Sequence, residues 1–231
     1  MTARLILLRH GQTTSNIGRY LDTEVPGAEL TDEGRAQATS VGIELADYCE
    51  VAPGSLGRLS GIYSSVAIRA QQTAMGVARS IEEVAGLPHR SMRVVPKAGI
   101  HEISAGNREM RHDDESHGFY STAMAGWLRG EPEARMPGER GENIDDILAR
   151  YQPVLEEIVG SDLDGGAADR DIIVVSHGAA IRTVATHAAS VDPEFAYAGY
   201  LANCRFIVLA PNNKPFGQWD LVRWSDLNHQ I

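Results

Sequence analysis

Lysine and cysteine are both scarce in this sequence of 231 residues. Its two lysines are Lys97 and Lys214, and its two cysteines, Cys49 and Cys204, lie far apart in separate apolar segments. Two distant cysteines supply neither a disulfide framework nor the spacing of a zinc site, so we expect both to be small buried side chains. Because 43% of the residues are hydrophobic, a chain of this length can bury an ample core without disulfides or metal.

Long hydrophobic runs are also absent. No apolar segment approaches the roughly 18 residues of a membrane-spanning helix. The amino-terminal segment is too short, and too soon interrupted by Arg9, to be a secretory signal. We therefore expect a cytoplasmic protein that makes no contact with a membrane.

Positive charge is in the minority. Lysine and arginine together number 21 against 31 aspartates and glutamates, which gives a formal net charge of −10. The sequence contains no dense basic patch, so a phosphate backbone would repel the chain, and we expect no nucleic acid partner. A positive site for a small anion must therefore be built mainly from arginine and histidine.

Glycine-rich nucleotide loops are missing as well. The sequence contains neither Gly-x-x-x-x-Gly-Lys-Ser/Thr nor Gly-x-Gly-x-x-Gly. The stretch of histidines and acidic residues at 112–117 does not have the ligand spacing of a tetrahedral metal site. We expect no metal ion and no organic cofactor.

Short apolar runs alternate along the chain with segments whose apolar residues recur at helical spacing. A continuous apolar run, typical of a buried parallel strand, occurs at residues 5–8. Further strands are expected at residues 61–63, 93–95 and 171–175, the last being the clearest. Two further strands are expected at residues 204–209 and 218–222, one of them an antiparallel edge. Apolar residues at helical spacing predict helices over residues 32–49, 67–84, 144–158 and 179–189. Thr31 has the position of an N-cap, Gly86 ends the second helix, and a polar loop containing glycine precedes residue 171.

This order of elements predicts the fold class. It indicates an α/β protein, a three-layer α/β/α sandwich whose mostly parallel sheet has helices on both faces. We expect one domain over residues 1–231. Residues 104–142 are rich in charge, glycine and proline, and we interpret them as an inserted lid with short helices near residues 116–128. An exposed edge strand near residues 218–223 would allow a homodimer.

Three predicted strand ends carry residues that can bind an anion. The first strand is followed by Arg9 and His10, the second leads to Arg69 in the first turn of its helix, and a later strand ends at His177. Because parallel strands end at the same edge of a sheet, these side chains can converge. Arginine forks and free N–H groups at a helix start suit a tetrahedral oxyanion such as phosphate.

Histidine adds chemistry that anion binding alone does not need. A neutral imidazole can attack phosphorus and form a phosphohistidine, and a second, protonated histidine can stabilise the charge that develops. The departing alkoxide then needs a proton from a nearby acid. Glu102 lies just after the third predicted strand at the same edge and is a candidate for that acid.

The ordered motifs resemble the histidine phosphatase superfamily, also called the phosphoglycerate mutase-like family. They are Leu-Leu-Arg-His-Gly-Gln-Thr at residues 7–13, Tyr-Ser-Ser at 63–65, Arg-Ala-Gln-Gln-Thr-Ala at 69–74, Glu102, Gly-Glu at 141–142 and Val-Val-Ser-His-Gly at 174–178. The resemblance covers roughly residues 5–210. Glu142 matches a family mark whose role we interpret as structural or related to the lid, although Asn143 replaces the hydroxyl residue usual there.

The resemblance implies a role for each matched position. His10 would be the phosphorylated nucleophile, and Glu102 would be the proton donor and later the base that activates water. The transferring phosphoryl group would be bound by Arg9, Arg69 and His177. Further substrate contacts would come from Asn16 and the backbone N–H of Gly178, with Gln12 and Thr13 close by.

Three functions remain open at this stage. We favour a phosphomonoester hydrolase acting on a small phosphorylated metabolite, because the arginine and tyrosine that mutases of this family carry just after the acid are absent here. The alternative is a 2,3-bisphosphoglycerate-dependent phosphoglycerate mutase, which the arginines of residues 104–142 keep open: Arg108, Arg111, Arg129, Arg135 and Arg140. A second alternative is a catalytically idle protein that binds a phosphorylated ligand or a partner.

Overall fold

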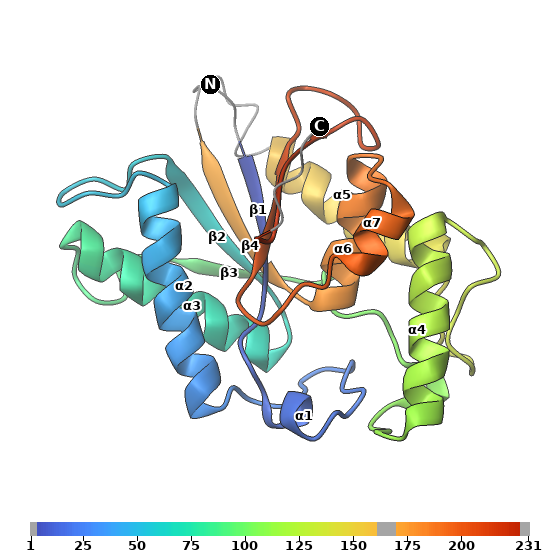
Figure 1. Ribbon diagram of the computed structural model, residues 1–231. Coiled ribbons are helices and arrows are strands. Elements are labelled where there is room, and N and C mark those ends of the chain that lie inside the picture. Colours follow the sequence, from blue (N-terminus) through green and yellow to red (C-terminus); the bar gives the residue numbers. More distant parts are fainter. Residues whose placement is uncertain (1–3, 161–169, 227–231) are drawn as a thin grey trace.

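A single sheet forms the centre of the molecule and has helices on both of its faces (Figure 1). The computed structural model describes residues 4–160 and 170–226. Most of the polar loop expected before residue 171 lies outside these described residues. None of the helices in the described ranges has the length and apolar character needed to cross a bilayer.

Within the described ranges six strands make up the sheet, in the order β3-β2-β4-β1-β5-β6. Their bounds are β1 Arg4–Arg9, β2 Leu59–Ser65, β3 Val94–Lys97, β4 Asp171–Ser176, β5 Phe206–Ala210 and β6 Asp220–Trp224. The first four are parallel to one another, β5 is antiparallel to β1, and β6 is antiparallel to β5. The prediction of a mostly parallel sheet is confirmed. Of the last two strands, β6 is the antiparallel edge, and dimerisation through it stays a prediction.

The long predicted helices are present, and two short ones were not expected. Helix α2 spans Asp32–Tyr48, α3 spans Ile68–Ala85, α5 spans Ile144–Ile158 and α6 spans Gly178–Ala188. The side chain of Thr31 accepts the N–H of Gly34 at the start of α2, and Gly86 ends α3 in the left-handed conformation. The unexpected helices are α1, Thr14–Ile17, and α7, Pro193–Ala198.

Two apolar cores lie on opposite faces of the sheet. Within β1, Leu5 and Leu7 belong to the core under α5 and α6, whereas Ile6 and Leu8 belong to the core under α2 and α3. This alternation arises because successive side chains of a strand point to opposite faces. The three-layer α/β/α architecture is thereby confirmed, and it explains why residues 5–8 of β1 and 172–175 of β4 are all apolar.

Residues 104–142 contain a short 3-10 helix, Gly106–Arg108, and one long helix, α4, Asp114–Arg129. The α4 side chains Met124, Trp127 and Leu128 are buried in the same core as α5 and α6. In Figure 1, α4 stands on the outer side of α6 and α7. Instead of the short helices expected near residues 116–128, the chain forms the one longer helix α4, because its apolar side chains pack continuously into this core. The role of the segment as a lid stays a prediction.

The register of the parallel strands brings the predicted site residues together. In the β1–β4 pair Arg9 lies opposite Ser176, and in the β2–β4 pair Ser64 lies opposite Val175. The chain therefore leaves all three strands at the same edge of the sheet. His10 follows β1 directly and His177 follows β4 directly.

Two glycines let the loop after β1 approach the start of α2. A Cβ atom at Gly34 would lie 2.1 Å from the carbonyl oxygen of Gln12, and one at Gly11 would lie 2.5 Å from the carbonyl oxygen of Gly34. Both contacts are with backbone atoms, which cannot rotate away. The loop that begins at His10 is thus held against α2 only because these positions lack side chains.

We predict opposite effects for two glycine-to-alanine substitutions in helices. Gly34→Ala should lower the free energy of unfolding by about 1–3 kcal/mol, because the added methyl group overpacks against backbone. Gly118→Ala, in α4 where no atom lies within 4 Å of the added Cβ, should raise it by up to about 1 kcal/mol through helix propensity. Urea unfolding of both variants checks this. A stabilised Gly34→Ala protein would contradict the close approach.

Candidate active site

His10 is positioned at the carboxyl end of β1 and is only 4% exposed. Its Nδ1 lies 2.7 Å from the carbonyl oxygen of Gly11. A carbonyl can only accept, so Nδ1 carries the proton and Nε2 holds the free electron pair. The carbonyl of His10 itself accepts the side-chain amide of Asn203 at 3.0 Å. The ring therefore has a defined tautomer with Nε2 available as a nucleophile.

His177 is the second buried imidazole and forms the N-cap of α6. Arg69 donates its Nε–H to Nδ1 of His177 at 3.3 Å, so the proton of this ring lies on Nε2, which is 2.9 Å from the hydroxyl of Ser65. The centroids of the His10 and His177 rings are 5.3 Å apart at an interplanar angle of 62°. Two strands far apart in sequence thus place their histidines edge to face.

The environment favours the neutral form of both histidines. Burial lowers the pKa of His10 well below its ordinary value, and the guanidinium groups of Arg69 and Arg9 lower it further. Burial is also the main cause that lowers the pKa of His177, followed by Arg69 and by His10. A neutral His10 is the state in which Nε2 can attack an electrophile.

Arg69 and Arg9 place guanidinium N–H groups beside His177 and Gly178. Arg69, 2% exposed, donates from Nη2 to the carbonyl of Asp22 at 3.1 Å. Arg9 donates from Nη1 to Leu201 at 2.6 Å and to the hydroxyl of Tyr200 at 2.8 Å. Within the described residues, Arg9 Nε and Arg69 Nη1 are buried and form no hydrogen bond. Buried cationic donors without acceptors are costly, so this pair is suited to an incoming anion.

Glu102 is held at the start of α6. Its Oε1 accepts the N–H of Ile103 and the N–H of Ala180, both at 2.9 Å, and its Oε2 accepts the N–H of Ala179 at 3.2 Å. These donors include two of the N–H groups that a helix leaves unsatisfied in its first turn. The carboxyl group is therefore fixed next to the turn that carries His177.

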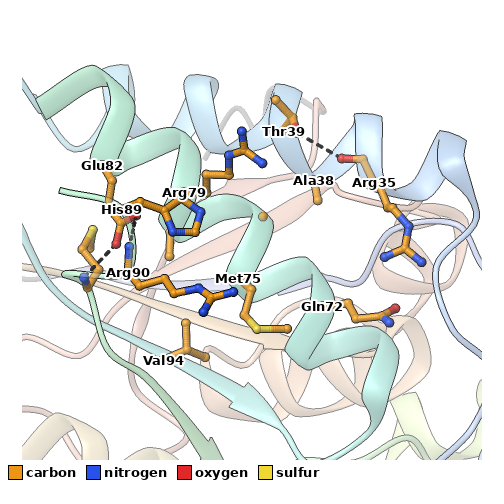
Figure 2. A pocket seen from close by; sticks show the side chains of 13 residues that line it. Arg35, Ala38, Thr39, Gln72, Met75, Arg79, Glu82, His89, Arg90 and Val94 are labelled. Atoms are coloured by element: carbon orange, nitrogen blue, oxygen red, sulfur yellow. Dashed lines mark hydrogen bonds between the residues drawn. The ribbon is translucent and has the colours of Figure 1, made fainter. Parts of the chain in front are cut away.

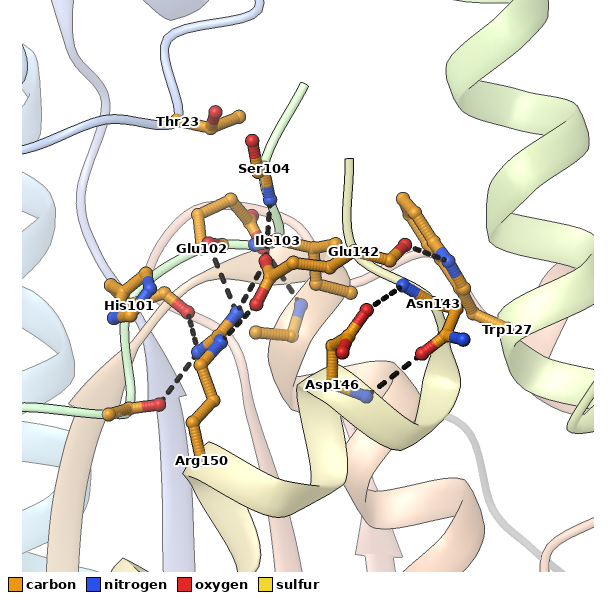
Figure 3. A network of polar contacts seen from close by, with 12 residues as sticks. Thr23, His101, Glu102, Ile103, Ser104, Trp127, Glu142, Asn143, Asp146 and Arg150 are labelled. Carbon is orange, nitrogen blue, oxygen red and sulfur yellow. Dashed lines mark hydrogen bonds and ion pairs between the residues drawn. The ribbon is translucent and has the colours of Figure 1, made fainter. Parts of the chain in front are cut away.

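The segment that carries Glu102 is tied to α5 by a single arginine, Arg150 (Figure 3). Its guanidinium donates to the carbonyls of Gly99, His101 and Glu102 at 2.6–3.3 Å and forms an ion pair with Glu142 at 2.5 Å. Glu142 in turn accepts the N–H of Ser104 at 2.9 Å. Residues 99–104 are thus clamped from one side, and this contact gives Glu142 a structural place.

The other predicted binding residues lie between β1 and the end of α1 or at the start of α6. Thr13 and Asn16 form the capping box of α1, and the side-chain oxygen of Asn16 also accepts the Asn203 amide at 3.1 Å. The Gln12 side chain accepts the hydroxyl of Thr31. Gly178 lies against Arg9, because a Cβ there would be 3.2 Å from Arg9 Nε. Their binding roles stay predictions.

Several site residues were not found from the sequence. Tyr200 and Asn203 reach the site from the loop after α7, and no local pattern marks them. Asp22, whose carboxylate lies 3.7 Å from Arg69 Nη1, follows a short irregular stretch. The sequence does mark Ser65, because it ends a strand and belongs to the motif at residues 63–65. Its contact with Nε2 of His177 does not follow from that motif.

These histidines and arginines at parallel strand ends correspond to a known family over nearly the whole chain. A family model described as histidine phosphatase superfamily (branch 1) matches residues 5–227. The chain belongs to this superfamily. The resemblance drawn from the motifs is confirmed, and the match extends past residue 210 to include β6.

Proteins similar to this chain include mycobacterial ones. PE-PGRS family protein PE_PGRS11 of Mycobacterium tuberculosis is 28% identical over 95% of this chain, which spans only 36% of that relative's length. Glucosyl-3-phosphoglycerate phosphatase of Mycolicibacterium vanbaalenii is 26% identical over 96% of this chain and 94% of its own. The structure of a mycobacterial glucosyl-3-phosphoglycerate phosphatase in complex with VO3 is 26% identical, with a TM-score of 0.71 over 96% of this chain and 98% of that one.

Two cavities of this superfamily member differ in their relation to Glu102. One of about 450 Å³ is lined by Glu102 and by the loops at residues 23–25, 101–104 and 140–142. Another of about 720 Å³ lies along α2 and α3, where the buried Glu82 accepts backbone N–H groups of Arg90 and Met92 (Figure 2). None of the predicted site residues lines the second cavity. The cavity beside Glu102 is the one suited to a substrate.

We predict that stability falls as the pH drops below the ordinary pKa of histidine. Below that pKa the histidines of the unfolded chain bind protons, whereas buried His10 and His177 of the folded chain stay neutral. The free energy of unfolding therefore decreases from about pH 6.5 downward. Between about pH 7 and about pH 5.5 each such histidine contributes a loss on the order of 1 kcal/mol. Urea unfolding at both pH values measures it. His10→Gln should reduce the loss in the free energy of unfolding by the contribution of one histidine. A loss identical to that of the wild type would contradict a neutral His10.

Proposed function

We propose that the chain hydrolyses phosphomonoesters of small metabolites through a phosphohistidine on His10. The observation that carries this proposal is the pair of buried imidazoles with ring centroids 5.3 Å apart, next to two arginines with unbonded N–H groups. Such a site binds a phosphoryl group and presents a nucleophile to it in the same place. Membership of the histidine phosphatase superfamily and similarity to phosphatases support the same activity.

In the first step His10 Nε2 attacks phosphorus. The N–P bond forms as the bond from phosphorus to the leaving oxygen breaks, and that oxygen takes a proton from the Glu102 carboxyl group. Arg9, Arg69 and the first-turn N–H of Gly178 neutralise the phosphoryl oxygens. Neutral His177, whose proton lies on Nε2, donates a further hydrogen bond to the phosphoryl group from that N–H. Asn16 extends these contacts, with Gln12 and Thr13 holding the loop.

In the second step water replaces the alcohol. Glu102, now a carboxylate, accepts a proton from the water as its oxygen attacks phosphorus. The N–P bond breaks, its electron pair returns to Nε2 of His10, and phosphate leaves. Splitting one displacement into two lets the same carboxyl group act first as acid and then as base.

Hydrolysis fits the arginines of residues 104–142 better than a mutase reaction does. A mutase must hold a second phosphate, which requires free cations near the site. Each of these arginines already faces a carboxylate of the chain itself: Arg108 with Glu115, Arg111 with Asp113, Arg129 with Glu194, Arg135 with Asp146 and Arg140 with Glu24. Isomerisation of phosphoglycerate faster than phosphate release would instead favour the mutase.

We predict that His10→Ala abolishes phosphate release from any phosphoester that the wild-type protein hydrolyses. The arginines remain, so calorimetry should still detect inorganic phosphate binding, weakened by no more than about tenfold. Wild-type protein quenched during turnover of labelled substrate should carry an acid-labile phosphoryl group that His10→Ala lacks. His89→Ala, an exposed histidine outside the site, is the control. Undiminished turnover in His10→Ala excludes the mechanism, and a wild-type protein inactive on a broad panel would favour the idle binding protein.

We predict that the loss of activity in Glu102→Gln depends on the leaving group. Removing a general acid costs about 10²–10⁴ in rate when the leaving oxygen needs a proton. For glycerol 3-phosphate we expect a loss in this range, and for p-nitrophenyl phosphate, whose leaving group departs unprotonated, a loss at least about tenfold smaller. Glu115→Gln, an exposed carboxylate on α4, serves as the control. Equal losses on both substrates would argue against the acid role of Glu102.

A further inference from the structure

Under the proposed function, the cavity of about 450 Å³ that Glu102 lines is the space next to the leaving oxygen. If the leaving oxygen lies next to Glu102, the rest of the substrate extends into the space between residues 23–25 and 140–142. Val25 and Val66 give part of its wall an apolar surface. The rest of the wall includes the charged side chains of Glu24, Arg140 and Glu142. Their charges determine which leaving groups can bind in this space.

The two arginines at this cavity already form ion pairs or hydrogen bonds with other groups of the protein. Arg140, the arginine in its lining, forms an ion pair with Glu24. Arg150 lies behind the lining and is shared between Glu142 and three backbone carbonyls. His101 also lines the cavity, and burial followed by the nearby Arg150 lowers its pKa, which keeps the imidazole neutral near pH 7.

The carboxylates of the cavity are committed in the same way. Glu24 holds Arg140, and Glu142 holds Arg150 together with the N–H of Ser104. The two oxygens of Glu102 accept backbone N–H groups of residues 103, 179 and 180. A charged leaving group of either sign would have to compete with one of these ion pairs. An anionic group would in addition lie against carboxylates, which is unfavourable by electrostatics.

We infer that the substrate has an uncharged, hydroxyl-bearing leaving group, as in a sugar phosphate or a glycerol phosphate. This inference rests on the proposed function and names its substrate class. A hydroxyl can donate to Glu24 or Glu142 and accept from Arg140 without disturbing either ion pair. The glucosyl-3-phosphoglycerate that gives the mycobacterial relative its name carries a carboxylate, so this chain differs from that relative in substrate charge.

Two three-carbon phosphates make the test a comparison of one group. Glycerol 3-phosphate and 3-phosphoglycerate differ only in having a hydroxymethyl group or a carboxylate at the far end. We expect kcat/KM for glycerol 3-phosphate to be at least about tenfold higher, which corresponds to about 1.4 kcal/mol. Phosphoethanolamine, with an ammonium group, should likewise be at least about tenfold poorer than glycerol 3-phosphate. p-Nitrophenyl phosphate reports whether the protein is an active phosphatase.

A matched pair of variants tests the source of the preference. Glu24→Gln leaves Arg140 without its carboxylate, so the ratio of glycerol 3-phosphate to 3-phosphoglycerate kcat/KM should fall several-fold. Glu83→Gln makes the same change in charge at the Arg79 ion pair on α3, outside this cavity, and should leave the ratio as in the wild type.

The outcomes separate this inference from the proposed function. Hydrolysis of p-nitrophenyl phosphate together with equal or better use of 3-phosphoglycerate or phosphoethanolamine overturns the inference alone. An unchanged substrate ratio in Glu24→Gln overturns the part assigned to the Glu24–Arg140 pair. Absence of hydrolysis of every phosphoester, including p-nitrophenyl phosphate, overturns the proposed function and the inference with it.

Discussion

The parallel register between β1 and β4 is the constraint on which the candidate site depends. Arg9 lies opposite Ser176, so the next residues, His10 and His177, leave the sheet side by side. Both strands are buried on two faces, and their alternate side chains belong to different cores. A slip of one residue would move every apolar side chain of β1 to the wrong face. Apolar packing of the whole sheet therefore enforces the distance between two polar rings at its edge.

Within this frame the site concentrates cationic and imidazole groups where water is largely excluded. The rings stay neutral because a charged imidazole would be buried next to Arg69 and Arg9. The arginines cannot lose their charge, and within the described residues Arg9 Nε and Arg69 Nη1 form no hydrogen bond, although the Asp22 carboxylate lies 3.7 Å from Arg69 Nη1. The arrangement is therefore suited to binding an anion. A phosphoryl dianion supplies the missing acceptors and the compensating charge, so binding and preorganisation have the same physical origin.

Local sequence patterns predict the parts of this site that strands position, and they fail for the parts that loops supply. Apolar runs identify β1 and β4, and residues directly after a parallel strand must lie at its carboxyl edge, so His10 and His177 follow from pattern and topology together. Tyr200 and Asn203 reach the site through contacts about 190 residues away in sequence, to Arg9 and to His10. No periodicity encodes such contacts. Short α7 has too few residues to produce a helical stripe.

The same division between strands and loops explains how one chemistry can serve different substrates. The phosphoryl end is set by strand ends and the first turn of α6, which cannot shift without repacking two cores. The leaving-group end is made by residues 23–25, 101–104 and 140–142, and Arg150 of α5 holds two of these segments, through the backbone around Glu102 and through the Glu142 carboxylate. Changes in the side chains of these loops alter charge and shape near the leaving group while His10 and His177 stay in place. Substrate class should therefore be read from the ion pairs of these loops, and reaction class from the strand ends.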